Sequence, residues 1–207
     1  MLTRPTPLVT AMGRVEARWA LLIGRRASGK SSLAARVAAT LGERGLAVGG
    51  VIQDAVEEDG TCVGIRVRRI GGDEHALLAR LGSAPRDGNE QAFCSFVFDN
   101  RAFAAARDWI AADASSAAVL IIDEVSKLEA ARSGHCEAVE RALAAAAVVV
   151  LVVRAEELSA VMERFALDEP IAALDAGEEA GIDGFVAAIA AAAQEVRRTN
   201  GRSQARS

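Results

Sequence analysis

The segment Trp19–Ser31 is WALLIGRRASGKS, a short apolar run followed by the pattern G-x-x-x-x-G-K-[ST]. An apolar run that stops at glycine predicts a buried strand, and the spacing of apolar residues over 33–41 predicts a helix directly after it. Glycine at Gly24 and Gly29 lets the backbone pass close to phosphate oxygens, with amide N–H groups at the helix N-terminus directed at them. The segment therefore predicts a phosphate-binding loop between a strand and a helix.

Two side chains of this loop carry the expected chemistry. The Lys30 ammonium is predicted to bind the β- and γ-phosphates, and the Ser31 hydroxyl to coordinate the Mg²⁺ that bridges them. Arg25 and Arg26 can reach the γ-phosphate or extend into solvent, and we favour solvent because the loop amides already point at the phosphates. The predicted nucleotide-binding residues are Gly24, Arg25, Arg26, Ala27, Ser28, Gly29, Lys30, Ser31 and Ser32.

A second apolar run, over residues 119–122, ends in the two acids Asp123 and Glu124. Asp123 is predicted to hold the Mg²⁺ through water, and Glu124 to take a proton from an attacking water. The two motifs together, a Walker A loop followed by a Walker B strand, favour hydrolysis over phosphoryl transfer. Lys127 and Glu129 follow the acids, and their spacing alone places them at the surface.

Apolar strand patterns alternate with helical patterns along the rest of the chain, which is typical of parallel strands joined by helical crossovers. A turn signal at 58–60 within residues 55–72 predicts a hairpin after the second strand, and residues 75–81 are compatible with a short helix before a loop at 82–89. Three phenylalanines between residues 93 and 98 predict core packing. The predicted strands cover 19–23, 46–52, 118–122, 148–153 and, weakly, 171–174, and the predicted helices cover 31–41, 101–112, 136–145, 156–165 and 182–196.

The predicted fold class is therefore α/β, with three layers and a mostly parallel, RecA-like P-loop sheet flanked by helices and followed after its second strand by a small β-hairpin. A chain of 207 residues with 51% hydrophobic residues is long enough for one such domain. We expect a poorly ordered lead over residues 1–17, a single P-loop domain over 18–197, and a disordered polar tail over 198–207.

Composition also indicates what the chain does not do. A net charge of −4 argues against nucleic-acid binding, and the longest apolar run, at 142–153, is too short to span a membrane. The N-terminus lacks the apolar core of a secretory signal, and three widely spaced cysteines fit reduced thiols, so we expect a cytoplasmic location. The two histidines, His75 and His135, lack ligand-like neighbours and are predicted at the surface or at helix caps.

Four segments, taken in order and spacing, resemble the cancer-related nucleoside-triphosphatase family of archaea, bacteria and humans. They are GRRASGKS, GGVIQDAVEEDGTCVGIRV, IIDEVSKLE and VVVLVVRAEEL, and the similarity covers about residues 19–183. The resemblance implies slow Mg²⁺-dependent hydrolysis of ATP, GTP and other nucleoside triphosphates to the diphosphate and phosphate. It gives Gly29, Lys30, Ser31, Asp123 and Glu124 the roles stated above.

The resemblance adds three further candidates. The family pattern D-E-I-G-K-M-E corresponds here to DEVSKLE, so Lys127 becomes a candidate site residue. Arg154 matches an arginine of the family and is a candidate internal arginine finger, which stabilises charge on the phosphates. Asp54 stands where the family often has a glutamate, and is a candidate for orienting water or substrate.

Two alternatives remain open. A small-molecule or nucleotide kinase would use Arg25, Arg26 and Arg154 to hold an acceptor phosphate, although no arginine-rich lid is visible. A nucleotide-gated adaptor with little turnover is favoured by the altered stretch 82–98, which lacks the family's glycine and tyrosine residues. The C-terminal half also resembles an uncharacterised bacterial group associated with molybdate transport genes. The sequence predicts neither a base preference nor a protein partner.

Overall fold

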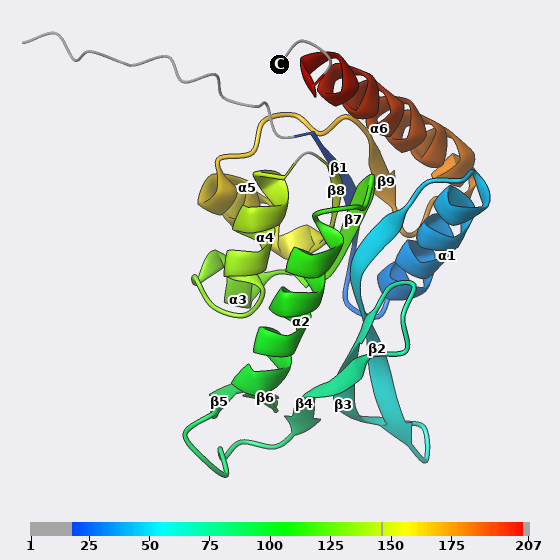
Figure 1. Cartoon of the computed structure of the whole chain (residues 1–207). Coiled ribbons are helices and arrows are strands. Elements are labelled where there is room, and N and C mark those ends of the chain that lie inside the picture. Colours follow the sequence, from blue (N-terminus) through cyan, green and yellow to red (C-terminus); the bar gives the residue numbers. More distant parts are fainter. Residues whose placement is uncertain (1–17, 146, 205–207) are drawn as a thin grey trace, which may run out of the picture.

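The computed structural model describes residues 18–145 and 147–204, in which one mixed β-sheet carries helices on both faces (Figure 1). The strands, in chain order, are β1 (Trp19–Gly24), β2 (Val48–Glu58), β3 (Thr61–Arg69), β4 (His75–Leu81), β5 (Glu90–Phe93), β6 (Phe96–Asp99), β7 (Val119–Val125), β8 (Val148–Arg154) and β9 (Ala173–Asp175). The α-helices are α1 (Lys30–Glu43), α2 (Asn100–Asp113), α3 (Lys127–Ala130), α4 (Cys136–Leu143), α5 (Leu158–Phe165) and α6 (Ile182–Gln204).

Half of the sheet is parallel, with the strand order β2-β7-β8-β1-β9. The phosphate-loop strand β1 and the acid strand β7 are therefore not neighbours, because β8 lies between them. The carboxyl ends of parallel strands meet at one edge of a sheet, which is where ligands bind in α/β folds. This arrangement brings the ends of β1, β7, β8 and β2 together and confirms the predicted α/β class.

The other half is antiparallel and larger than the hairpin that the sequence predicts. β2 continues past the parallel part and turns at Asp59 and Gly60 into β3, and the order then runs β3-β4-β6-β5. The predicted short helix at 75–81 is wrong, since these residues form β4 with Leu78 buried and Leu77 exposed. β4 pairs with β3 along one edge and with β6 along the other.

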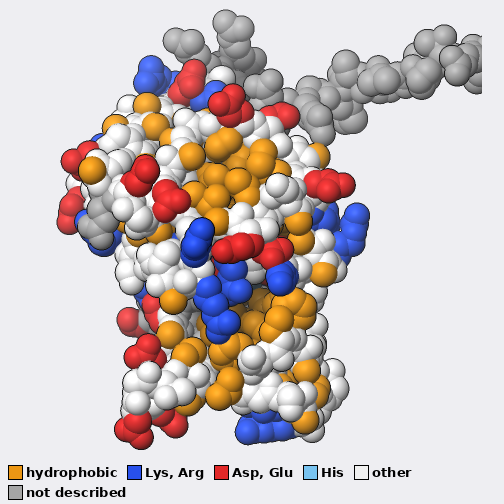
Figure 2. Space-filling model, turned by 180° about the vertical axis from the view of Figure 1, so that it is seen from behind, with side chains coloured by type: hydrophobic (Ala, Val, Ile, Leu, Met, Phe, Trp, Pro, Cys, Tyr) orange, Lys and Arg blue, Asp and Glu red, His pale blue; other side chains and the backbone are white. Residues whose placement is uncertain are grey.

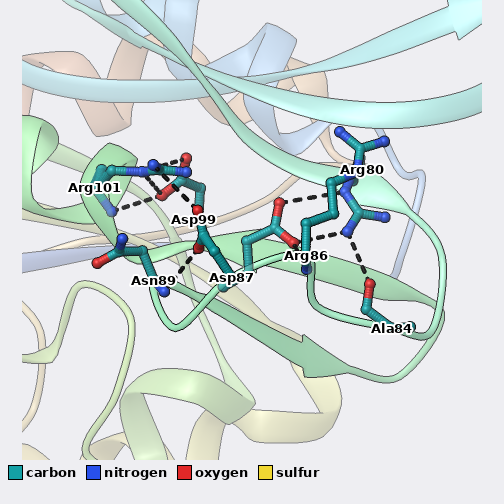
Figure 3. Close-up of polar contacts among 8 residues, drawn as sticks. Arg80, Ala84, Arg86, Asp87, Asn89, Asp99 and Arg101 are labelled. Atoms are coloured by element: carbon teal, nitrogen blue, oxygen red, sulfur yellow. Dashed lines mark hydrogen bonds and ion pairs between the residues drawn. The ribbon is translucent and has the colours of Figure 1, made fainter.

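The loop between β4 and β5 is held by two groups of charged side chains (Figure 3). Arg80 donates to the Glu90 carboxylate at 2.7 Å. Arg101 donates to Asp99 at 2.9 Å and forms an ion pair with Asp87 at 3.4 Å. The loop predicted at 82–89 is confirmed, and paired charges on its flanking strands fix it to the antiparallel half of the sheet.

The two faces of the sheet bury separate apolar clusters. Helices α1 and α6 cover one face, while α2, α4 and α5 cover the other (Figure 1). Successive side chains of a strand point to opposite faces, so Leu120 and Leu151 join the cluster under α2 and α4, and Ile121 and Val150 join the one under α1 and α6. Strands buried on both faces explain the unbroken apolar runs in the sequence. The predicted three-layer arrangement is confirmed.

The ends of the chain lie partly outside the described residues. The lead predicted over residues 1–17 is outside them, as are residues 205–207. Helix α6 continues to Gln204, into the stretch predicted as a disordered tail, because residues 185–200 are rich in alanine and contain no glycine or proline. None of the described helices is long and apolar enough to cross a membrane.

Candidate active site

The loop between β1 and α1 has the conformation that its glycines predict. Gly29 has φ +82° at the N-cap of α1, and Ala27 also has a positive φ of 57°. A Cβ at Gly24 would lie 2.5 Å from the Ser28 hydroxyl, so only glycine fits there. The Lys30 side chain is buried, and its ammonium donates to the Arg25 carbonyl at 2.8 Å. The loop thus exposes the first amides of α1 at the sheet edge.

The remaining predicted loop residues lie around this turn. Arg25 and Arg26 are exposed, as expected for side chains that extend into solvent, and Ser32 is exposed on the first turn of α1. Ser31 is half-buried and its hydroxyl lies beside Asp123, where it lowers the pKa of that carboxyl against the stronger effect of burial. Two chain segments far apart in sequence therefore meet at the Ser31 hydroxyl.

Asp123, at the end of β7, is fully buried, and one of its oxygens accepts the main-chain N–H of Gln53 at 3.0 Å. The other oxygen has no hydrogen-bond partner within the described part of the chain. Burial raises the pKa of Asp123 to about 7. A buried carboxylate oxygen without a partner, beside a hydroxyl, is an oxygen donor set that suits Mg²⁺ completed by substrate phosphates and water.

Glu124 lies between two cations. One carboxylate oxygen is 3.3 Å from the Lys30 ammonium and the other is 2.6 Å from the Arg154 guanidinium. Arg154 ends β8, the strand between β1 and β7, so the order of the sheet delivers it to this point. The structure therefore brings Lys30, Glu124 and Arg154 together beside the loop. Figure 2 shows basic and acidic side chains gathered near the middle of the face opposite that of Figure 1.

Two other candidates, Lys127 and Asp54, form ion pairs of their own. Lys127 is exposed and pairs with Glu157 at 3.6 Å, so its ammonium makes no ion pair with the site carboxylates within the described residues. Asp54 pairs with Arg68 at 2.7 Å across the β2–β3 hairpin. Its neighbour Gln53 is the residue that contacts Asp123, so β2 contributes to the site through a residue that the sequence did not single out.

The prediction that Glu129 is a surface residue is wrong. Its side chain is buried and accepts the main-chain N–H groups of Ser126 and His135, each at 2.8 Å. Burial raises the pKa of Glu129 to about 7. Ser126 and Glu129 form a capping box at the start of α3, and the spacing S-x-x-E is the signal that would have found this carboxylate.

The prediction that His135 lies at the surface is also wrong. The ring is 1% exposed and packs edge-on against Phe103, with 4.9 Å between ring centroids. His135 occupies the N-cap position of α4, but its side chain makes no cap hydrogen bond. Burial lowers the pKa of the imidazole to about 4. In the sequence, His135 stands between a glycine and a cysteine, and neither neighbour predicts that the imidazole is buried.

Known proteins resemble this chain over the residues that build the site. The sequence model of a protein family described as NTPase matches residues 20–177. The chain belongs to this NTPase family. The resemblance found in the sequence is thereby confirmed, and the match includes the phosphate loop, both acids and Arg154.

Individual relatives of the NTPase family agree with this assignment. The nucleoside-triphosphatase THEP1 of Thermofilum pendens is 32% identical over 125 residues, which are 59% of this chain and 66% of that protein. The THEP1 protein of Methanopyrus kandleri is 32% identical over 134 residues, covering 64% of this chain and 71% of that protein. The solution structure of a human cancer-related nucleoside triphosphatase superposes with a TM-score of 0.62 at 23% identity, over 86% of this chain and 98% of that one, and so shares the fold.

Proposed function

We propose that this NTPase hydrolyses nucleoside triphosphates, ATP and GTP among them, to the diphosphate and phosphate in a Mg²⁺-dependent reaction. The observation that carries the proposal is Glu124, held at 3.3 Å from the Lys30 ammonium and 2.6 Å from Arg154 at the mouth of the phosphate loop. A carboxylate beside the phosphate-binding lysine is placed to accept a proton from water near the γ-phosphate. This position supports hydrolysis rather than transfer to a second substrate.

The proposed roles follow from what each residue contacts. The amides of the loop and the Lys30 ammonium bind the β- and γ-phosphates, and Lys30 then leaves one Glu124 oxygen free to accept a water proton. Arg154 stays on the other oxygen or turns to the developing charge on the phosphates. Ser31 and Asp123 would hold Mg²⁺, which neutralises phosphate charge when it is bound.

Phosphate release from ATP, GTP, CTP and UTP, with Mg²⁺ and with EDTA, tests the proposal. We expect Lys30→Ala to lose nucleotide binding and turnover together. Glu124→Gln should still bind nucleotide while its turnover falls ~10²–10⁴-fold, the usual contribution of a general base. Arg141→Ala is the control, since this exposed arginine pairs with Glu137 within α4. Unchanged turnover in Glu124→Gln, or phosphate transfer that appears only with an added acceptor, would contradict the proposal.

We also propose that the reaction takes place in the cytoplasm. Cys62, Cys94 and Cys136 are free thiols, as the sequence analysis expected for a reducing compartment. Fractionation of cells that produce the tagged chain tests this location, and recovery in a membrane or secreted fraction would contradict it.

A further inference from the structure

Gln53 lies beside the proposed magnesium carboxylate but has no role in the mechanism described above. It stands where β2 leaves the parallel half of the sheet, and its main-chain N–H donates to Asp123 at 3.0 Å. This bond uses only the backbone, so it fixes the position of the residue without engaging the side chain. The side chain is half-buried and extends toward the face of the sheet covered by α2 and α4.

A buried imidazole lies behind the Gln53 amide. The Gln53 side-chain nitrogen is 3.4 Å from the Nε2 atom of His135. With the amide nitrogen as the donor, Nε2 is the acceptor and the proton of the neutral ring resides on Nδ1. Burial keeps the ring neutral by lowering the pKa of His135 to about 4. The Gln53 carbonyl is then the end of the amide that does not face the ring.

His135 is itself held on two sides. Its ring packs against Phe103, and its main-chain N–H is bonded to the buried Glu129 carboxylate at 2.8 Å. Glu124 lies close enough to Glu129 for its charge to add to the effect of burial on the pKa of that carboxyl. Glu124 follows Asp123 in β7, and Gln53 of β2 donates to Asp123 and contacts His135, which is bonded to Glu129.

We infer that Gln53 is a further catalytic residue, whose side-chain carbonyl orients the attacking water, and that His135 is the positioning residue that holds its amide. The inference rests on the proposed hydrolysis. One hydrogen of the attacking water forms a hydrogen bond to the Gln53 carbonyl, and the other proton of this water passes to Glu124. The water oxygen forms a bond to the γ-phosphorus as the bond between the γ-phosphorus and the nucleoside diphosphate breaks. A glutamine amide suits this task because it orients water without competing for the proton.

The substitution Gln53→Ala isolates the side chain, because the main-chain N–H that holds Asp123 is retained. We expect kcat to fall ~10–100-fold, less than for a general base, while KM and the binding of a fluorescent ATP analogue with Mg²⁺ stay within about twofold. Gln91→Ala is the matched control, since Gln91 is also half-buried but bonds to Ser133 at 3.2 Å on the antiparallel half. Its kcat should remain that of the unmodified chain.

The variant His135→Leu tests the positioning role. Its kcat should fall less than that of Gln53→Ala, and the double variant should be no slower than Gln53→Ala alone, because the two residues act as a unit. His135→Gln, which restores an acceptor near the Gln53 amide, should recover part of the loss. A kcat of Gln53→Ala within twofold of the unmodified chain, or a loss expressed only in KM, would overturn the inference. Activity retained by Glu124→Gln would instead overturn the proposed hydrolysis mechanism.

Discussion

The buried Glu129 carboxylate makes the strongest stability prediction, because both of its oxygens are used by the backbone. They accept the N–H groups of Ser126 and His135, each at 2.8 Å, and so tie the start of α3 to the start of α4. Glu129→Ala leaves two buried donors without partners. Each such donor costs ~1–3 kcal/mol, so the free energy of unfolding should fall by about 4 kcal/mol at acid pH.

The cost of Glu129→Ala should depend on pH with a definite sign. Burial raises the pKa of Glu129 from 4.5 to about 7, so between these values the folded chain keeps a proton that the unfolded chain has lost. The resulting stabilisation is complete below about pH 4.5 and is lost as the pH rises through about 7, a difference of ~3 kcal/mol. The variant has no such group, so its deficit should shrink from about 4 kcal/mol at pH 5 to about 1 kcal/mol at pH 8.5.

Urea denaturation of the full chain at pH 5, 7 and 8.5 measures this trend. Glu129→Gln provides a second variant, since its amide does not titrate and still offers one acceptor. Glu163→Ala is the control, because this glutamate is exposed on α5 and its removal should change the unfolding free energy by less than about 0.5 kcal/mol at each pH. A deficit of Glu129→Ala that stays constant or grows between pH 5 and 8.5 would refute the reasoning.

Four further substitutions have predicted effects on stability. His135→Leu should make the fold less sensitive to acid, since a pKa lowered from 6.5 to about 4 means that stability falls by ~3 kcal/mol as the pH drops through that interval; thermal melts at pH 4.5 and 7 check it. Gly50→Ala should destabilise by at least ~3 kcal/mol, because φ is +106° and a Cβ would overlap a β7 carbonyl, whereas Gly42→Ala meets no neighbour and should be neutral or stabilising in urea titrations. Lys127→Ala should cost less than ~1 kcal/mol in urea titrations, since the Lys127 side chain is more than half exposed where it pairs with Glu157.

The sequence predicted those parts of the fold whose signals are local. A glycine pattern between an apolar strand and a helix specifies the loop around Lys30, and an apolar strand that ends in two acids specifies Asp123 and Glu124. The antiparallel half of the sheet was harder to predict, because β4 has the composition of either a strand or a helix. Its conformation is decided by pairing with β3 and β6, which are neighbours that a local pattern does not contain.

The part of the site that the sequence missed depends on contacts between distant segments. In the sequence, Gln53 is a polar residue near the end of a predicted strand, and nothing there points to a role in the site. Its role depends on the position of β2 next to β7, where the Gln53 N–H reaches Asp123. His135 follows a glycine in a polar loop, and only the fold places it between Phe103 and the Gln53 amide. A motif thus names the groups that meet phosphate and metal, whereas strand order decides which other side chains surround them. In this NTPase the order β2-β7-β8-β1 places Gln53 on one side of the acids and Arg154 on the other.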